Sequence, residues 1–324
     1  MPAAAIAGAR EAGFAAPPPR RIAAVPAPLR RVDARVFQIL FLGALLLGGA
    51  LWRDFALRWE QVALTFAAGI AAQALWIRAL GLGSVGYLSA LVTCLGTAIL
   101  VRADTLWVHP LVAALALSAK FTVRIRGKHV FNPTNLAVIL AIAAMPGAWA
   151  SPGQWGSELM IGLWLATLGV AVTTSARRLD IAWFFLGSYA ALLAARVLIL
   201  GQSEAVLLHQ LGNGALIMFT FFMISDPMTT PNRRALRFAY AALVAVLAFV
   251  WQFLLFKTNG LVWALFLLSP LVPLLDRLWP GAKHVWQSQA RGGQLAVRAP
   301  SPRPASAGLS GAAAGATVRV VPTP

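Results

Sequence analysis

The sequence predicts an all-α protein that crosses a membrane many times. Of its 324 residues, 59% are hydrophobic and only 11% are charged. Apolar runs close to the ~20 residues that a membrane helix needs recur along the chain between short polar loops. Helices are the expected form because lipid offers no hydrogen-bond partner to an unpaired backbone group. This composition excludes an ordinary soluble globular domain.

Ten apolar runs are candidate membrane spans, and the fourth and sixth are shorter than the ~20 residues of a full crossing. The ten runs are residues 36–52, 62–80, 84–101, 106–119, 131–149, 159–174, 181–200, 205–224, 236–256 and 261–275. Ten spans divide into two groups of five, and because five is odd the second group would run inverted. Glycine or proline breaks fall at loosely matching places in the two groups, which favours an inverted repeat. The alternative is that glycine and proline are simply common in membrane helices.

The basic residues of the loops favour one orientation of these spans. With ten spans and the N-terminus inside, nearly all Lys and Arg residues fall on the inner side. The outer segments hold only Arg53, Arg58, Arg102, Arg196 and Lys257. This asymmetry follows the positive-inside rule and predicts that both termini are cytoplasmic. It also explains the net charge of +17 without nucleic acid as a partner.

Composition divides the chain into three parts. Residues 1–35 predict a disordered basic cytoplasmic arm, residues 36–278 a ten-helix transmembrane domain, and residues 279–324 a disordered cytoplasmic tail. The single cysteine, Cys94, excludes an intrachain disulfide and favours a small buried side chain. No cluster of residues has metal-ligand spacing, and no set of catalytic residues is predicted.

Two charged loops interrupt the apolar sequence. Residues 120–135 read KFTVRIRGKHVFNPTN, and residues 224–234 read ISDPMTTPNRR. Asn132 before Pro133 is favourable N-cap chemistry for a helix, and Asp226 before Pro227 repeats it. Capping is one interpretation. The other is that these basic helix ends bind an anionic or electron-rich cofactor.

Three phrases in the chain resemble one family of redox membrane proteins. They are YLSALVT at residues 87–93, FNPTN at residues 131–135 and MISDPMTTP at residues 223–231. They are similar to the RnfD/NqrB family, the D subunit of the Rnf electron-transport complex and the B subunit of the sodium-pumping NADH:quinone oxidoreductase. The resemblance implies ten helices in two inverted halves, a fold related to urea and ammonium channels. It also implies a bacterial inner-membrane location and flavin-linked electron transport beside other redox subunits, with ion movement.

The resemblance implies a site for a non-covalent flavin, riboflavin or FMN, near the FNP segment. Asn132 and Asn135 are the matching candidates, since an amide both donates and accepts hydrogen bonds. Arg126 and Lys128 could stabilise a reduced flavin, although inward-facing loop charge explains them as well. The second phrase adds Asp226 and Thr229 as candidates.

One departure from the family concerns a second flavin. Family members attach FMN covalently to a threonine in a loop on the outer side. The corresponding loop, residues 146–158, reads PGAWASPGQWGSE and contains no threonine, so covalent FMN is not expected. Stand-alone relatives also occur beside natural-product pathways. The alternative function is therefore a channel or transporter of the same fold without a redox role.

Overall fold

The computed structural model describes residues 33–52, 57–82, 86–151 and 159–284. The chain divides into two units, Met1–Ala282 and Lys283–Pro324, and only the first two residues of the second unit are described. The predicted arm and tail therefore lie almost entirely outside the described residues. All that follows concerns the first unit.

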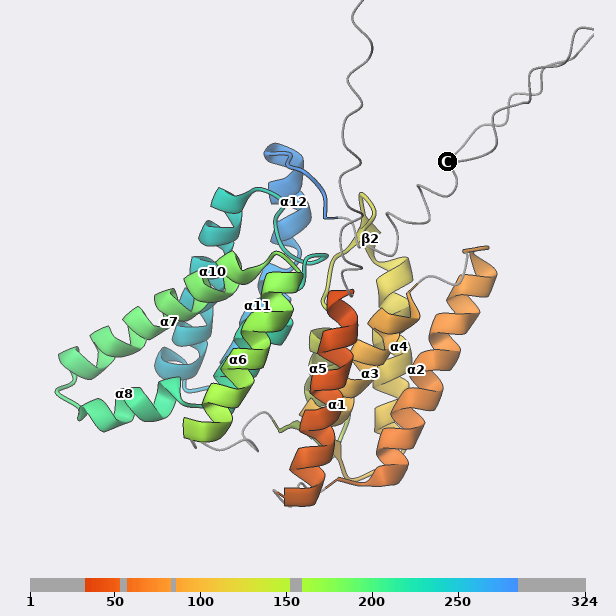
Figure 1. Cartoon of the computed structure of the whole chain (residues 1–324), viewed down its shortest axis with the longest axis horizontal. Coiled ribbons are helices and arrows are strands. Elements are labelled where there is room, and N and C mark those ends of the chain that lie inside the picture. Colours follow the sequence, from red (N-terminus) through yellow and green to blue (C-terminus); the bar gives the residue numbers. More distant parts are fainter. Residues whose placement is uncertain (1–32, 53–56, 83–85, 152–158, 285–324) are drawn as a thin grey trace, which may run out of the picture. The chain divides into compact units, whose positions relative to one another are not determined.

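The first group of helices packs around α3, which contacts the other four, and α2 lies at its outer edge (Figure 1). The group consists of α1 (Ala34–Trp52), α2 (Trp59–Ala79), α3 (Tyr87–Leu100), α4 (Val108–Thr122) and α5 (Pro133–Ala144). Helix α2 packs against α3 and α4, α1 packs against α3, and α5 packs against both α3 and α4.

Two short antiparallel strand pairs mark the two ends of this group. Strand β1 (Val101–Ala103) pairs with β4 (Ala148–Ala150), and β2 (Arg124–Ile125) pairs with β3 (Lys128–His129). The first pair lies where α3 ends and α4 begins, and the second joins α4 to α5. We call these the β1 end and the β2 end of the first unit.

The second group of helices is centred on α7 and α10. Its members are α6 (Leu159–Ser175), α7 (Leu179–Ile199), α8 (Glu204–Leu211), α9 (Gly214–Met218), α10 (Arg234–Phe249), α11 (Gly260–Leu268) and α12 (Leu271–Leu278). Two π-helical segments, η2 (Phe219–Met223) and η3 (Val250–Leu254), continue α9 and α10. Helix α10 packs against α7 and α11, and α6 packs against α9 and η2. The two groups meet where α1 contacts α6 and α5 contacts α11.

Every predicted span contains at least one helix, and several are long enough to cross a membrane. Four described segments qualify by length and composition: Ala34–Leu51, Trp59–Ala79, Leu179–Ile199 and Arg234–Leu254. Two bent pairs, α8 with α9–η2 at 45° and α11 with α12 at 43°, raise the number to as many as six. Helices α3, α4 and α5 are apolar but shorter. The described residues thus contain the helices of a multi-pass membrane protein.

Three predicted spans differ from the structure in their boundaries. The fifth, residues 131–149, was expected to be one helix, but α5 ends at Ala144 because the chain turns at Pro146-Gly147, where Gly147 adopts a φ of +66°. The eighth breaks at residues 212–213, and Asn213 caps a new helix by accepting the amide hydrogen of Ala215. The tenth breaks before Leu271, at Pro270, which has no amide hydrogen to donate.

Helices α2 and α7 share their length and their ending. Each has 21 residues and is followed by a leucine and then a glycine with a left-handed φ, +61° at Gly81 and +60° at Gly201. In both, the amide two residues after the leucine donates to a carbonyl in the last turn at 2.9 Å, Leu82 to Ile77 and Gln202 to Val197. The bonds and the glycines are those of a Schellman cap.

Candidate functional site

Asn132 lies at the β2 end as the N-cap of α5, and Pro133 occupies the first helical position. Its side-chain oxygen accepts the amide hydrogen of Asn135 at 3.1 Å. Its side-chain nitrogen donates to the carbonyl of Met223 at 3.4 Å and to Oδ2 of Asp226 at 3.3 Å. The capping interpretation is therefore correct, and in addition the side chain ties the two charged loops together.

Asp226 is the acidic partner in the second loop. Its Oδ1 accepts the amide hydrogen of Met228 at 3.0 Å, and the imidazole Nε2 of His129 lies 3.5 Å from its Oδ2. Burial raises the pKa of this carboxyl, but the His129 imidazole, the Met228 amide and the Thr229 hydroxyl outweigh burial and lower it below the usual value. The carboxylate is therefore the form that these contacts stabilise.

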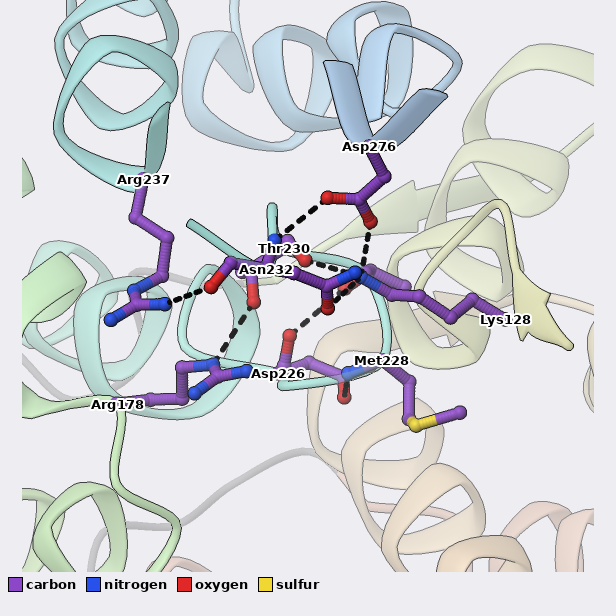
Figure 2. Close-up of polar contacts among 9 residues, drawn as sticks. Lys128, Arg178, Asp226, Met228, Thr230, Asn232, Arg237 and Asp276 are labelled. Carbon is purple, nitrogen blue, oxygen red and sulfur yellow. Dashed lines mark hydrogen bonds and ion pairs between the residues drawn. The ribbon is translucent and has the colours of Figure 1, made fainter. Parts of the chain in front are cut away.

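Lys128 joins the β2–β3 hairpin to the second group of helices (Figure 2). Its ammonium group donates to the carbonyl of Thr230 at 2.5 Å, to Oδ1 of Asn232 at 3.3 Å and to Oδ2 of Asp276 at 3.0 Å. Burial lowers the pKa of Lys128, and the bond to Asp276 opposes that effect. Asp276 also accepts the amide hydrogen of Asn232 at 2.8 Å. Three segments distant in sequence thus meet at one buried ion pair.

Two arginines complete the cluster on the side of α7. Arg178 precedes α7 and donates to the hydroxyl of Thr230 at 3.2 Å, and burial lowers its pKa to about 10. Arg237 of α10 donates to Asp180 of α7 and to the carbonyl of Asn232, the latter at 2.8 Å. Figure 2 shows the contacts of Arg178 with Thr230 and of Arg237 with Asn232 beside those of Lys128 and Asp276.

Of the six predicted site residues, four meet in this cluster. Asn132, Lys128 and Asp226 make the contacts given above, and Thr229 is buried beside Asp226 with its hydroxyl 3.5 Å from the Asp226 carbonyl. Arg126 instead lies exposed at the tip of the β2–β3 hairpin, with a φ of 53°. Asn135 lies one turn inside α5.

Asn135 has an acceptor atom without a partner in the described part of the chain. The side chain is fully buried, and its nitrogen donates to the carbonyl of Val262 at 3.3 Å. Its Oδ1 has no hydrogen-bond partner. Val262 and Met223, the two residues whose carbonyls hold Asn135 and Asn132, both line a cavity of about 410 Å³. The predicted asparagine pair therefore lies behind the wall of this cavity.

Sequence reasoning missed most of the cluster. The residues it did not single out are His129, Arg178, Asp180, Thr230, Asn232, Arg237 and Asp276. One signal was available, because Asp276 follows closely on the last apolar run, where a carboxylate needs a partner. That this partner is Lys128 could not be read from a separation of 148 residues.

The comparisons with known proteins agree with the resemblance drawn from the sequence. Residues 147–283 match the model of a family described as the NQR2, RnfD, RnfE family. This segment contains the MISDPMTTP phrase, whereas the other two phrases precede it. The match confirms the predicted resemblance to the RnfD/NqrB membrane subunits. No curated protein matches the chain.

Proposed function

We propose that this protein is a membrane subunit of a flavin-linked, Rnf/Nqr-type electron-transport system in the bacterial inner membrane. The family match over residues 147–283 is the observation that carries the proposal. The apolar helices and the buried cluster at the β2 end support it, because both are features of a membrane protein with a polar site between its helices. Other membrane redox subunits are the proposed partners, and ion movement coupled to electron transfer is part of the proposal.

A non-covalent flavin fits the residues around Asn135. Its unpartnered Oδ1 would accept a hydrogen bond from a ring N–H, the kind of donor that an isoalloxazine supplies. A cavity of about 410 Å³ is lined by Val262 and Met223 but not by Asn135 itself, and its volume lies within the range of roughly 300–1,000 Å³ that is typical of small-molecule sites. Asp226 and Lys128 do not line this cavity and would set the charge near the ring only of a flavin bound toward the β2 end. A bound flavin would supply the redox chemistry, and the protein would bind and orient it.

The test is the visible absorption spectrum of the detergent-purified protein, followed by the ratio of flavin to protein in variants. Asn135→Leu should lower flavin retention by roughly 5- to 150-fold, the effect of losing a buried hydrogen bond of ~1–3 kcal/mol. A matched control is Ser203→Ala, which removes the cap of α8 without touching α5. Absence of flavin from the wild type, or unchanged flavin in Asn135→Leu, would end the assignment.

The role of Asn132 needs a different substitution. Asn132→Asp would keep the cap but place a second carboxylate about 3.3 Å from Asp226 Oδ2, so its effect would mix repulsion with any loss of flavin. Asn132→Ser keeps the capping oxygen and removes only the nitrogen donor. We expect reduced flavin content in Asn132→Ser with a small change in thermal unfolding. A change in unfolding alone would assign Asn132 to structure.

We also propose that the first unit consists of two inverted halves, with ten spans and both termini cytoplasmic. The shared length and cap of α2 and α7 support the repeat, as do the matching contacts of α4 with α5 and α10 with α11. Helix α2 begins beside Asp104 at the β1 end, whereas α7 begins beside Thr230 at the β2 end. Reporter fusions after Arg126 and Arg178 should report the cytoplasm. An outer-side signal at Arg178 would contradict the orientation.

A covalent flavin is not part of this proposal. The described part of the loop corresponding to the family's attachment site, residues 146–151, contains no threonine, and residues 152–158 lie outside the described residues. Denatured protein co-expressed with a flavin transferase should show no in-gel flavin fluorescence. A fluorescent band at the mass of the protein would contradict this expectation.

A channel or transporter without a redox role is the second candidate. The two bent helix pairs favour it, since broken helices that meet between repeats commonly form solute sites in transporters. The absorption spectrum separates the two candidates, because a flavin absorbs where the polypeptide does not. A colourless but folded protein would favour transport.

A further inference from the structure

Buried polar side chains run along one face of α2. Gln61, Thr65 and Gln73 are 3%, 0% and 0% exposed, and together with Gly69 they occupy every fourth position of the helix. Such spacing keeps side chains on one face. Since a helix rises about 1.5 Å per residue, the set spans roughly 18 Å along the helix axis. Polar groups at this depth of a membrane helix are costly and point to a path or a site.

Each end of this polar face reaches a charged group. At the β1 end, Gln61 lines a cavity of about 540 Å³ together with Arg58, Arg102 and Asp104. At the β2 end, the Lys120 ammonium donates to Oε1 of Gln73 at 3.1 Å. The polar face therefore connects a cavity at one end with a lysine at the other.

His109 of α4 has one ring nitrogen, Nε2, that has no hydrogen-bond partner among the described residues. The Thr65 hydroxyl donates its only hydrogen to the carbonyl of Gln61 at 2.7 Å, so its oxygen must accept from Nδ1 of His109 at 3.1 Å. These bonds assign the hydrogen of the neutral imidazole to Nδ1. The lone pair of Nε2 is then left without a partner among the described residues, although the side chain is 1% exposed.

Gln73, in contrast, has a hydrogen-bond donor without a partner. Its Nε2 is buried and has no hydrogen-bond partner in the described part of the chain. Gly86 lies so close that a Cβ there would be 2.9 Å from this nitrogen, so the amide packs directly against a glycine that offers it no side-chain partner. Buried polar atoms without protein partners are typically satisfied by ordered water, which needs only a small polar space.

An apolar contact separates the two polar stretches. A Cβ on Gly69 would lie 2.4 Å from Cys94 Sγ and 3.0 Å from Leu117 Cδ1, and both of these side chains are fully buried. Cys94 and Leu117 pack together with Ala90 in a small cluster of their own. Such a contact excludes water and acts as a gate when its side chains move.

We propose that the interior of α2, α3 and α4 holds a file of water that conducts protons, with a closed gate at Cys94 and Leu117. A proton from the β1 end binds Nε2 of His109 and forms an imidazolium. When the gate opens, this proton passes along water to Lys120, which has first released one proton at the β2 end. One proton enters and one leaves, and no bond other than N–H and O–H changes. The Lys120 ammonium opposes the passage of metal cations, which favours protons as the cargo.

This inference rests on the ion movement in the proposed function and names the ion and its path. It does not depend on whether a flavin is bound. Packing alone does not require these polar groups. Helix α7 has the same length and the same buried spacing, yet its buried face is made of Ile181, Phe185, Tyr189, Leu193 and Val197.

The first test is proton flux into proteoliposomes that contain a pH-sensitive dye, driven by a potassium diffusion potential. Leu117→Ala should raise the flux about tenfold or more above the wild type, because it removes the gate. Adding His109→Phe or Gln73→Leu to Leu117→Ala should return the flux to the wild-type level. The matched control, Gln252→Leu added to Leu117→Ala, removes an amide of the second half and should leave the flux high. Flux that is insensitive to His109 and Gln73, or an equal flux of sodium, would overturn the proposal.

The second test needs no gate variant and uses Cys94, the only cysteine of the chain. Silver ion reaches a thiol only through water, and its reaction is read as the loss of later maleimide labelling in denatured protein. In the wild type, Cys94 should react with silver ion that enters from the β1 end, and His109→Phe should slow the reaction about tenfold whereas Gln252→Leu should not. If Cys94 never reacts, or reacts equally in all variants, then no water file reaches it and the proposal is wrong. Flavin content is measured in parallel and is expected to stay unchanged in His109→Phe, because His109 does not line the cavity of about 410 Å³, whereas Gln252 does.

Discussion

Helices α2 and α7 have the same length and the same C-terminal cap, but the side chains that they bury differ in polarity. Five of the six buried positions of α7 lie 120 residues after a buried position of α2, as Ile181 follows Gln61 and Phe185 follows Thr65. At the first four of these positions α2 carries two amides, a hydroxyl and a glycine, whereas α7 carries aliphatic and aromatic side chains; at the fifth both helices carry an aliphatic residue. Length, caps and spacing therefore set where a helix is buried, and they leave open what is buried there.

The two groups of helices also differ in where their polar residues lie. In the first group they are distributed along α2 from Gln61 to Gln73, facing His109 of α4. In the second group they gather at the β2 end, at the start of α7 and in the loop after η2. One group thus has amides and an imidazole along a candidate membrane span, and the other has its charged side chains in a cluster at one end.

The largest expected effect comes from the apolar body. Phe185 is fully buried between Tyr189 and Phe219, with ring centroids 5.9 and 5.1 Å away. Phe185→Ala should lower the free energy of unfolding by about 3–5 kcal/mol, because it creates a cavity. The counterpart Thr65→Ala should cost only about 1–3 kcal/mol, because it leaves one histidine nitrogen unpaired. Denaturant unfolding of both variants in the same detergent measures the difference. Equal costs would contradict the contrast.

The ion pair at the end of the second group gives the next effect. Lys128→Met leaves the Asp276 carboxylate buried without its cation and should cost about 3–5 kcal/mol. Combining it with Asp276→Asn should recover part of that loss, since the asparagine oxygen can still accept from the Asn232 amide. As a control, Arg234→Met removes an exposed ion pair, in which Nε of Arg234 lies 3.7 Å from Oδ2 of Asp180. It should change the free energy of unfolding by about 0–1 kcal/mol. Strictly additive costs of the two substitutions would show that the pair is not coupled.

Gly69 tests the tight packing of α2. Gly69→Ala places a Cβ against Cys94 Sγ and should cost about 1–3 kcal/mol by overpacking. Cys94→Ala removes the sulfur and should recover much of the loss in the double variant. Thermal unfolding of the two single variants and the double variant measures the coupling. A fully stable Gly69→Ala would mean that the helices separate without cost.

The smallest expected effect is the pH dependence that Asp226 contributes. Its pKa is lower in the folded protein than the ordinary 3.8, so its stabilising contribution is present above that value. The contribution is lost as the pH falls through the lowered pKa. Asp226→Asn should therefore be less stable than the wild type at pH 7, and the two proteins should converge as the pH falls below the lowered pKa of Asp226. Unfolding midpoints measured from neutral to acidic pH test this, and a constant difference at every pH would contradict it.

Local patterns in the sequence predicted the helices and one cap correctly. Apolar runs placed a helix in every predicted span, and Asn132-Pro133 marked the start of α5. The runs could not show that α5 ends before Met145, because the pairing of β1 with β4 joins residues far apart in the chain. The phrase MISDPMTTP led to the family, and the match over residues 147–283 confirmed that resemblance.

The sequence by itself determined that this is a helical membrane protein, because hydrophobicity over about 20 residues is a local property that lipid selects directly. It also determined which loops carry charge. Only the tertiary structure decided which charges meet, joining Lys128 to Asp276 and Asn132 to Asp226. It alone placed the imidazole of His109 against Thr65 in the interior of the first group. The physical reason is that an ion pair or a hydrogen bond forms over a few ångströms of space, and no local pattern records which distant segments the packing of helices brings that close.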